Sequence, residues 1–435
     1  MRKGSKQPDH EFSDGVVCFA GTDWWYHPRG HSECQIMRRL ARRTTVLWVN
    51  SIGMRAPKPG VARNPLGRYW RKLKSTLRGL RRDAGGMWVY SPVFIPRYSP
   101  RFVRINGWLV RAQVRMLCRL LGIKRPSAWV TVPTAAHAAL GSAFHRRVFN
   151  RCDDFAKFPQ ADAVTISALE HKLLVGCDAT VFVSRTLFER ERDLSPHPVL
   201  LGHGLDYDHF ARDHDDPAFA TNNNPLDGIR TPIIGFYGGI EDYTVDLDLL
   251  RSTARRFPDA TLVVAGPRSV GTTALEAEPN VRVLGPIPYD QLPSIASRFD
   301  VGVMPWREND WIRACNPIKL KEYLALGFPI VSTPFPALGP FLDHVRVGGS
   351  PDEFADAIRS ALRDSCQRAR ARRRAAVRGE SWDAKAERVA HLLTLPPNAS
   401  ARRQVEYKRR ALSPEPHAAS MPTSAADQSP RVTSS

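Results

Sequence analysis

Short apolar runs alternate with segments of helical periodicity along most of the chain, and this alternation is the feature that most restricts its fold. Such a pattern is typical of parallel strands joined by crossover helices. It occurs twice, before and after a stretch at 213–231 that is rich in Asn, Asp and Pro and has the composition of a linker. A chain of 435 residues exceeds the size at which one hydrophobic core usually stops growing, so we expect two domains.

The apolar runs predict parallel sheets in both halves of an α/β protein. Strands are expected at 15–20, 45–50, 87–91, 127–132, 147–151, 179–184, 232–237, 260–265, 280–284, 300–304 and 329–332. Helices are expected at 32–43, where Ser32 can serve as the cap, and at 243–257, 289–298, 317–326, 352–364 and 382–394. The corresponding units are an N-terminal domain at 15–212, the linker at 213–231, a C-terminal domain at 232–380 and a last helix within 381–398. Residues 1–14 are polar and 399–435 have few large apolar side chains, so we expect both segments to be disordered.

The formal net charge of +20 indicates attraction to polyanions or to the anionic inner leaflet of a membrane. No apolar stretch approaches the roughly 20 residues that a membrane-spanning helix requires, and the N-terminus lacks an apolar signal core. We therefore expect a cytoplasmic protein. Seven scattered cysteines without a CxxC pair argue against disulfides and a structural zinc site, and we expect neither a metal nor a cofactor.

The segment 316–327, with the sequence NPIKLKEYLALG, carries the clearest chemical signal. Asn316 suits the N-cap of a helix, Pro317 suits its first position and Gly327 ends it. On this helix Lys319 and Glu322 share a face close to the N-terminus, which favours phosphate. A nucleoside diphosphate needs this pair: a cation for the diphosphate and a carboxylate that accepts hydrogen bonds from both ribose hydroxyls. An isolated pair of this kind is usually only a surface ion pair, but here the helix starts at the carboxyl edge of a sheet, where α/β proteins bind ligands.

With this motif the chain resembles the GT-B glycosyltransferases, and within them family 4 and its bacterial cell-surface polysaccharide relatives. The resemblance spans about 15–395 and is most specific at 300–333. It also includes 233–240 (IIGFYGGI), 262–267 (LVVAGP), 281–293, 23–36 and 153–155 ahead of 182–189. It implies two Rossmann-like domains that face each other across a cleft, with the nucleotide on the C-terminal domain, the acceptor on the N-terminal domain and the terminal helix crossing back.

The resemblance also implies roles for single residues. Glu322 would bind the ribose, Lys319 the phosphates, and the turn at Gly238 and Gly239 would bring backbone N–H groups to the diphosphate. Asn316 belongs to the same donor site. The loop 285–287, ending in Ile287, would flank the base, and Arg268 is a weaker phosphate candidate. The glycines could equally serve a tight turn. Many family members have an acidic residue where this chain has Ala314, so Glu308 or Asp310 would have to replace that carboxylate.

Sugar transfer requires neutralisation of the departing diphosphate and, with inversion, a base for the acceptor hydroxyl. Asp153 and Asp154 follow the strand predicted at 147–151 and are the candidate catalytic residues, with Asp23 as the next candidate. The alternative for the pair is a turn with a helix cap. Histidines such as His203 are more often structural, and we assign it no role.

Two basic segments point to a membrane. At 63–82 the apolar residues Leu66, Trp70, Leu73, Leu77 and Leu80 recur at spacings of three and four among arginines and lysines, as in an interfacial helix. The segment 101–125 repeats the pattern with Val103, Val110, Val114, Leu117 and Leu121. For this second segment, packing of the apolar stripe on its own domain is an equal alternative.

The sequence therefore predicts a glycosyltransferase that moves a sugar from a nucleotide-diphosphate sugar to a lipid-linked or other glycan acceptor in cell-surface polysaccharide synthesis. We expect it at the inner face of the cell membrane, peripherally bound to the anionic surface, and without a nucleic-acid partner. The alternatives are a nucleotide-sugar epimerase or hydrolase on the same scaffold, and a non-catalytic basic protein that binds membranes or polyanions.

Overall fold

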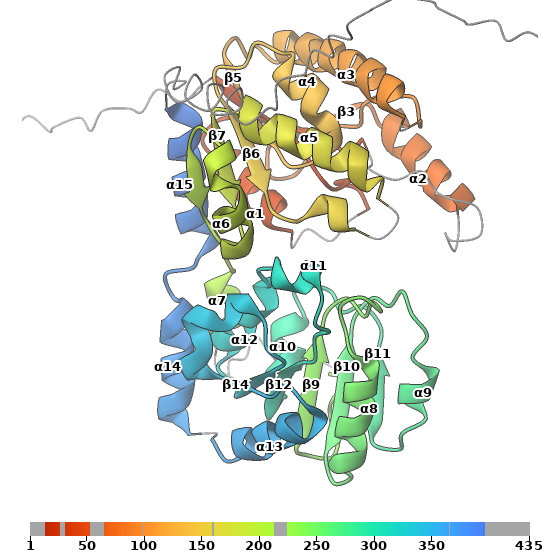
Figure 1. Cartoon of the computed structure of the whole chain (residues 1–435), viewed down its shortest axis with the longest axis vertical. Helices are drawn as coiled ribbons and strands as arrows, with labels where there is room; N and C mark the ends of the chain where they lie inside the picture. Colours follow the sequence, from red (N-terminus) through yellow and green to blue (C-terminus); the bar gives the residue numbers. More distant parts are fainter. Residues whose placement is uncertain are drawn as a thin grey trace, which may run out of the picture.

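Two sheets of mainly parallel strands, one in each half of the chain, form two α/β domains that are stacked along the long axis of the molecule (Figure 1). The computed structural model describes residues 14–26, 31–52, 65–97, 99–158, 161–212, 224–364 and 366–395. Most of the segments expected to be disordered or to act as a linker lie outside these residues. The predicted double α/β architecture is confirmed.

The N-terminal sheet has eight strands in the order β3-β4-β2-β1-β5-β6-β7-β8. Neighbouring strands pair in parallel, except for β3 with β4. The strands are β1 (Gly15–Phe19), β2 (Thr45–Val49), β3 (Leu80–Arg82), β4 (Trp88–Tyr90), β5 (Pro126–Val130), β6 (Arg147–Arg151), β7 (Ala179–Phe182) and β8 (Pro198–Leu200). The prediction missed β3 and β8, and the helix expected at 63–82 ends at Leu77 because the chain turns into β3 there.

The C-terminal sheet is parallel throughout, in the order β11-β10-β9-β12-β13-β14. Its strands are β9 (Ile233–Tyr237), β10 (Thr261–Ala265), β11 (Val281–Leu284), β12 (Val301–Met304), β13 (Ile330–Ser332) and β14 (Val345–Val347), the last of which was not predicted. This is the strand order of the Rossmann fold. From β9 the chain adds strands first on one side of the sheet and then, from β12, on the other side. The crossover helices on either side of this point leave a ligand-binding crevice at the carboxyl ends of β9 and β12.

Helices cover both faces of each sheet (Figure 1). In the first half they are α1 (Ser32–Leu40), α2 (Pro65–Leu77), α3 (Pro100–Leu120), α4 (Ala136–Leu140), α5 (Ala163–Gly176), α6 (Arg185–Glu191) and α7 (Tyr207–Phe210). In the second half they are α8 (Leu247–Arg256), α9 (Thr273–Glu276), α10 (Leu292–Ala296), α11 (Asp310–Arg313), α12 (Ile318–Leu326), α13 (Pro351–Leu362), α14 (Gln367–Val377) and α15 (Trp382–Thr394). The expected capping role of Ser32 is wrong, because His31 occupies the N-cap position and Ser32 is already helical.

The last helix, α15, returns from the C-terminal domain and packs on the N-terminal one, as predicted (Figure 1). Trp382, at its first position, is buried in the N-terminal core. The Ser127 hydroxyl of β5 donates to the Leu393 carbonyl at 2.9 Å, and Arg39 of α1 pairs with Asp383 at 3.0 Å. This helix therefore ties the two domains together.

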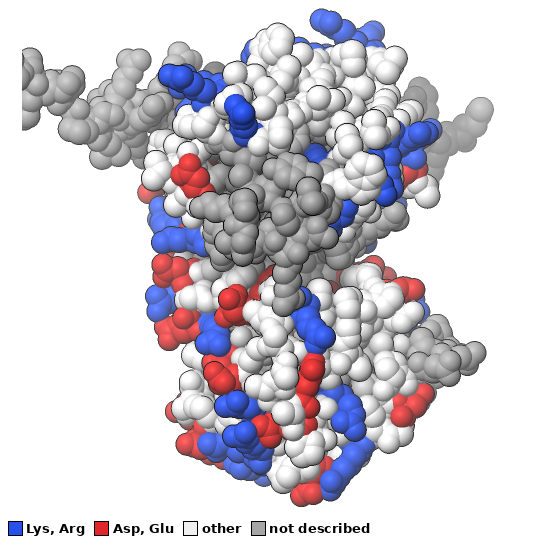
Figure 2. Space-filling model, turned by 90° about the vertical axis from the view of Figure 1, so that its right-hand side faces the viewer, with Lys and Arg blue, Asp and Glu red and all other residues white. Residues whose placement is uncertain are grey.

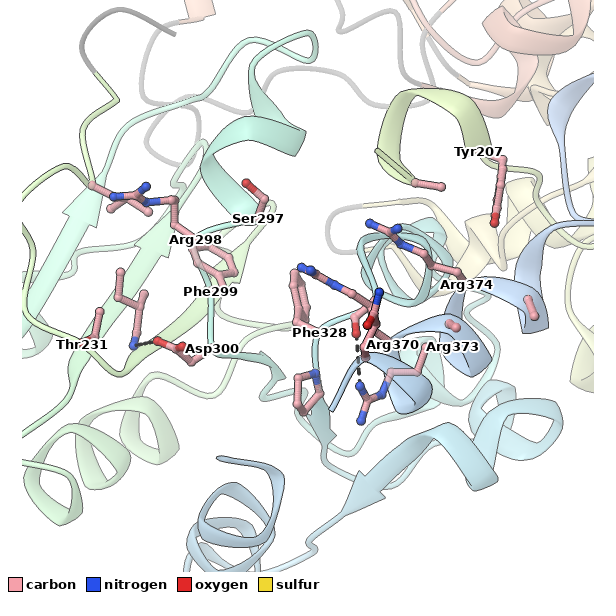
Figure 3. A pocket seen from close by; sticks show the side chains of 18 of the residues that line it. Tyr207, Thr231, Ser297, Arg298, Phe299, Asp300, Phe328, Arg370, Arg373 and Arg374 are labelled. Carbon is pink, nitrogen blue, oxygen red and sulfur yellow. Dashed lines mark hydrogen bonds between the residues drawn. The ribbon is translucent and has the colours of Figure 1, made fainter. Parts of the chain in front are cut away.

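A cavity of about 1410 Å³ lies at the amino ends of the C-terminal strands, and the arginines of α14 lie along it (Figure 3). Arg373 donates to the Gly327 carbonyl at 3.1 Å, and Arg374 donates to the Ala325 carbonyl at 3.2 Å. These carbonyls belong to the last turn of α12 and its C-cap, where the helix itself provides no further N–H groups to donate to them. The arginines therefore complete the C-terminus of α12, at the edge of the sheet opposite to the one where ligands usually bind.

Candidate functional site

A second cavity, of about 410 Å³, lies between the two domains at the carboxyl edge of the C-terminal sheet. The N-terminal domain contributes His31, Asp153 and His203 to its wall. The C-terminal domain contributes Tyr237, Gly239, Glu241, Thr244, Tyr289, Trp306, Trp311, Cys315, Asn316, Pro317, Ile318, Lys319 and Glu322. The cavity therefore occupies the crevice that the strand order predicts and brings side chains of both domains together.

The helix α12 carries the predicted pair Lys319 and Glu322 into this cavity. The helix begins one residue later than expected: Pro317 is the N-cap, with extended backbone, and Ile318 is the first helical residue. The prediction that Asn316 caps the helix is therefore wrong. Its side-chain amide instead donates to the Val183 carbonyl of the N-terminal domain at 2.9 Å, so it joins the domains while it lines the cavity. The expected end of the helix is confirmed, because Gly327 adopts a left-handed conformation with φ of 84°.

Glu322 is almost fully buried, with 7% of its surface exposed. The Tyr237 hydroxyl, at the end of β9, donates to its Oε2 at 2.9 Å. Burial raises the pKa of Glu322 to about 7, while the hydrogen bond from Tyr237 and the charge of Lys319 act against that rise. A carboxylate held in this way retains oxygen lone pairs that can accept hydrogen bonds from a ligand.

Lys319 lies beneath the glycine turn that follows β9. Gly238 has φ of 147°, and a Cβ at this position would overlap with the Lys319 side chain. A glycine is therefore required for the backbone to cross over the lysine. Burial lowers the pKa of Lys319, and the carboxylates of Glu322 and Glu241 partly offset that effect. The result is an ammonium group, an N-terminal helix turn and a glycine loop at one end of the cavity.

A second lysine of the same helix has a different task. Lys321 is buried, pairs with Glu380 at 2.6 Å and donates to the His203 carbonyl of the N-terminal domain. It fixes α12 at the junction of the domains. Lys319 is thus the lysine of α12 that faces the cavity.

Asp153 reaches the cavity from the end of β6. Burial raises its pKa to about 7, although the neighbouring Arg151 guanidinium opposes the rise. His203 lies on the same wall, and burial, reinforced by the charge of Lys321, lowers its pKa to about 3. The N-terminal wall therefore offers a carboxyl group that titrates near neutral pH and a neutral imidazole. The sequence analysis assigned His203 no role, and its place in this wall is an addition from the structure.

Asp154, the other candidate for catalysis, does not line this cavity. Its carboxylate pairs with Arg190 at 2.9 Å and with Arg151 at 3.3 Å. Arg151 is buried as well and also pairs with Glu170 and Glu191. Arg151 donates in addition to the backbone carbonyl of Asp153, so this cluster holds the strand end on which Asp153 stands. The structure separates the two neighbouring aspartates into a cavity residue and a member of a buried ion-pair cluster.

Several other predicted residues lie elsewhere. Arg268 pairs with Glu276 at 2.5 Å, and Ile287 packs against the C-terminal core; neither lines the cavity. Glu308 pairs with Arg313. Asp310 pairs with Lys157 across the domains, and Asp23 accepts a hydrogen bond from Ser75 of α2, both also away from the cavity.

Two groups in the cavity wall were missed by the sequence analysis. Glu241 lies two residues after Gly239, near the carboxyl end of β9, a position that would have marked it as a candidate. The aromatic residues Tyr289, Trp306 and Trp311 have no spacing pattern that distinguishes them from core residues. Together they give the cavity flat apolar surfaces beside its charged groups.

Residues 231–364, which make up most of the C-terminal domain, match the model of the family Glycosyl transferases group 1. The putative teichuronic acid biosynthesis glycosyltransferase TuaH of Bacillus subtilis (strain 168) is 27% identical over 244 residues. That match covers 53% of this chain and 55% of the relative, so the chain spans about half the length of the curated relative it matches.

Solved structures resemble almost the whole chain. Sucrose-phosphate synthase from Thermosynechococcus elongatus matches with a TM-score of 0.58 and 14% identity, covering 92% of this chain and 99% of that one. The trehalose-6-phosphate protein from E. coli bound with UDP-2-fluoro glucose matches with a TM-score of 0.62 and 14% identity, covering 88% and 100%. The UDP-forming α,α-trehalose-phosphate synthase from Burkholderia xenovorans matches with a TM-score of 0.61 and 15% identity, covering 89% and 100%. At these identities the likeness shows the fold, which is the two-domain GT-B fold expected from the sequence.

Proposed function

We propose that this chain, which has the GT-B fold and a C-terminal domain of the glycosyl transferases group 1 type, transfers a sugar from a nucleotide-diphosphate sugar to a glycan acceptor in cell-surface polysaccharide synthesis. The observation that carries the proposal is the position of Lys319 and Glu322, side by side on the first turns of α12 and facing the cavity between the domains. The relative in teichuronic acid biosynthesis supports the polysaccharide class.

The charged groups of the C-terminal domain indicate which end of the cavity binds the donor. Glu322 accepts hydrogen bonds from the ribose hydroxyls, and Lys319 with the N–H groups of the turn at Gly238 and Gly239 receives the diphosphate. As the bond between sugar and phosphate breaks, negative charge develops on the diphosphate, and these fixed groups stabilise it. Arg268, Ile287 and Asn316 have no direct part in this assignment.

The acceptor is placed against the wall of the cavity that the N-terminal domain forms. Asp153 faces the donor groups across the cavity and is the candidate base that takes the proton from the acceptor hydroxyl. Its pKa of about 7 suits this role, because a base works best when it is free of its proton near the working pH. Glu241, beside Lys319, is the carboxylate available near the transferred sugar in place of the one lost at Ala314.

We also propose a lipid-linked acceptor and peripheral binding at the inner face of the cell membrane. The helix α2 exposes Trp70, Leu73 and Leu77 on one side, which supports an interfacial role. Lys72, in contrast, faces inward and donates to the Ser51 carbonyl at 2.8 Å. Among the described residues, no helix combines the length and the apolar character needed to cross a bilayer.

The proposal is tested by incubating the protein with nucleotide sugars, with and without membrane-derived glycan acceptors, and by separating the products. Sugar transfer that depends on the acceptor and is lost in Glu322→Ala supports it. Conversion of the nucleotide sugar without any acceptor would instead indicate an epimerase or hydrolase. Polyanion binding that is indifferent to Glu322, with no conversion of any donor, would indicate a non-catalytic basic protein.

A further inference from the structure

The helix α3 has apolar residues on two faces, and only one of them belongs to the core. The stripe recognised in the sequence, with Val103, Val110, Val114 and Leu117, is buried under the N-terminal sheet. A second stripe points outward, and its members are three, eight and four residues apart, which keeps them on one side of the helix. Its large members and their exposed fractions are Ile105 (44%), Trp108 (60%), Met116 (58%) and Leu120 (72%).

The loop at 91–97 contacts both α3 and α2. Val93 in this loop is 60% exposed, and its backbone exchanges two hydrogen bonds of 2.9 Å with the Gln113 side chain of α3. The next residue, Phe94, lies 5.3 Å from the Lys72 ammonium of α2. Eight of the eleven exposed large apolar side chains in the described part of the chain lie on α2, this loop and α3. Single exposed apolar residues are ordinary, but a cluster of this kind marks a docking surface.

The charged residues around this cluster are almost all cationic. From Cys34 to Cys152, Asp83 is the only acidic residue, whereas Arg104, Arg111, Arg115 and Arg119 recur along α3. Seen from the side of α2, the part of the N-terminal half that is not grey is mostly white and blue, while red and blue residues are mixed on the C-terminal half (Figure 2). Exposed apolar side chains flanked by cations, without carboxylates, complement an anionic lipid surface, where Trp and long aliphatic side chains enter the headgroup region.

We propose that the outward face of α3, together with α2 and Val93, is the docking surface of the protein on an anionic bilayer. In Figure 1, α3 lies on the side of the N-terminal domain that points away from the C-terminal domain. Docking through it leaves the C-terminal domain clear of the lipid and free to exchange its nucleotide. This inference deepens the proposed lipid-linked acceptor and rests on it, but binding to vesicles can be measured without catalysis.

The test is flotation with phosphatidylcholine vesicles that contain either no phosphatidylglycerol or about one third of it. We expect the full chain to bind the anionic vesicles and the double variant Trp108→Ser with Met116→Ser to lose at least about tenfold in partitioning. Leu342→Ser is the matched control, since Leu342 is 55% exposed but lies on the C-terminal domain. Because all three side chains are exposed, we expect unchanged thermal unfolding in both variants.

The inference is overturned if the double variant floats like the unaltered chain, or if Leu342→Ser weakens binding equally. It is also overturned if heparin, a soluble polyanion, is bound while anionic vesicles are not. Activity on a water-soluble glycan acceptor separates the two proposals. Transfer without vesicle binding contradicts the docking surface alone, and vesicle binding without any transfer contradicts the proposed function alone.

Discussion

The Tyr237 hydroxyl lies 2.9 Å from Oε2 of Glu322, so a residue at the carboxyl end of β9 holds the carboxylate of α12 inside the cavity between the domains. Burial raises the pKa of that carboxyl to about 7. The cavity thus contains a group whose charge changes close to neutral pH, at the position assigned to the ribose of the donor.

Nucleoside diphosphate binding should strengthen as the pH rises through about 7, because only the ionised Glu322 accepts hydrogen bonds from both ribose hydroxyls. Tyr237→Phe removes a hydrogen bond that favours the ionised form, so it should move the midpoint to higher pH and weaken binding by about 1 kcal/mol at neutral pH. Calorimetric titration with UDP and GDP over this range measures both effects. The control is Glu322→Gln, in which any remaining pH dependence comes from the phosphates of the ligand. If the midpoint of the pH dependence moved to lower pH in Tyr237→Phe, the assignment of Glu322 to the ribose would be contradicted.

Glu322 should lower the stability of the fold at neutral and alkaline pH. Its pKa of about 7 in the folded chain exceeds the ordinary 4.5, so the folded state holds the proton more tightly than the unfolded state does. The resulting loss of stability begins above the ordinary pKa and is complete above about 7. Glu322→Gln should therefore increase the free energy of unfolding by up to about 3 kcal/mol near pH 8 and have little effect near pH 4, since one pKa unit corresponds to about 1.4 kcal/mol. Urea unfolding at both pH values checks this, and a variant less stable at pH 8 would disprove it.

At a pH well above 7, where Glu322 is ionised, Lys319→Ala should weaken nucleoside diphosphate binding by about 1.5–3 kcal/mol, the scale of a lost charged hydrogen bond, and leave nucleoside binding nearly unchanged. Arg268→Ala is the control, since Arg268 is a cation of the same domain that pairs with Glu276 outside the cavity. Calorimetry with UDP and with uridine separates the contributions of phosphate and ribose. An equal loss for both ligands, or an equal effect of Arg268→Ala, would refute the role of Lys319.

The sequence predicted the elements where local signals agree with the fold. The helix α15 has its expected bounds because Ser381 caps it, with its hydroxyl accepting from the Ala384 N–H, and because apolar residues recur along the face that packs on the N-terminal core. The start of α12 was misplaced, since Asn316 is drawn into a hydrogen bond with Val183, which is distant in the sequence.

Local sequence patterns could not predict which way individual side chains point in the folded protein. α3 has two apolar stripes, and which one is buried depends on the sheet beneath it, not on the periodicity of the helix. The pair Asp153 and Asp154 shows the same limit at a strand end, where neighbouring side chains point to different surroundings. Glu241 was missed because its importance comes from its place beside Lys319 in space.

The different surroundings of Asp153 and Asp154 lead to opposite expectations for the same substitution. Asp153→Asn should reduce kcat by about 10²–10⁴-fold, the range of a lost general base, while donor affinity stays close to that of the unaltered chain. The fold should be no less stable, because the raised pKa of Asp153 means that its ionised form destabilises the folded state at neutral and alkaline pH. Asp154→Asn should destabilise the fold by about 3 kcal/mol, because it removes a carboxylate from a buried cluster that contains Arg151 and Arg190.

Steady-state kinetics and urea unfolding of both variants decide between these roles. In the unaltered chain kcat should rise with pH through about 7, because a base must lose its proton before it can accept one, and this rise should disappear in Asp153→Asn. Retained kcat in Asp153→Asn would remove it as the base and leave Glu241 as the cavity carboxylate to test next. If Asp154→Asn lost its catalytic activity without any loss of stability, the roles assigned to the two aspartates would be reversed.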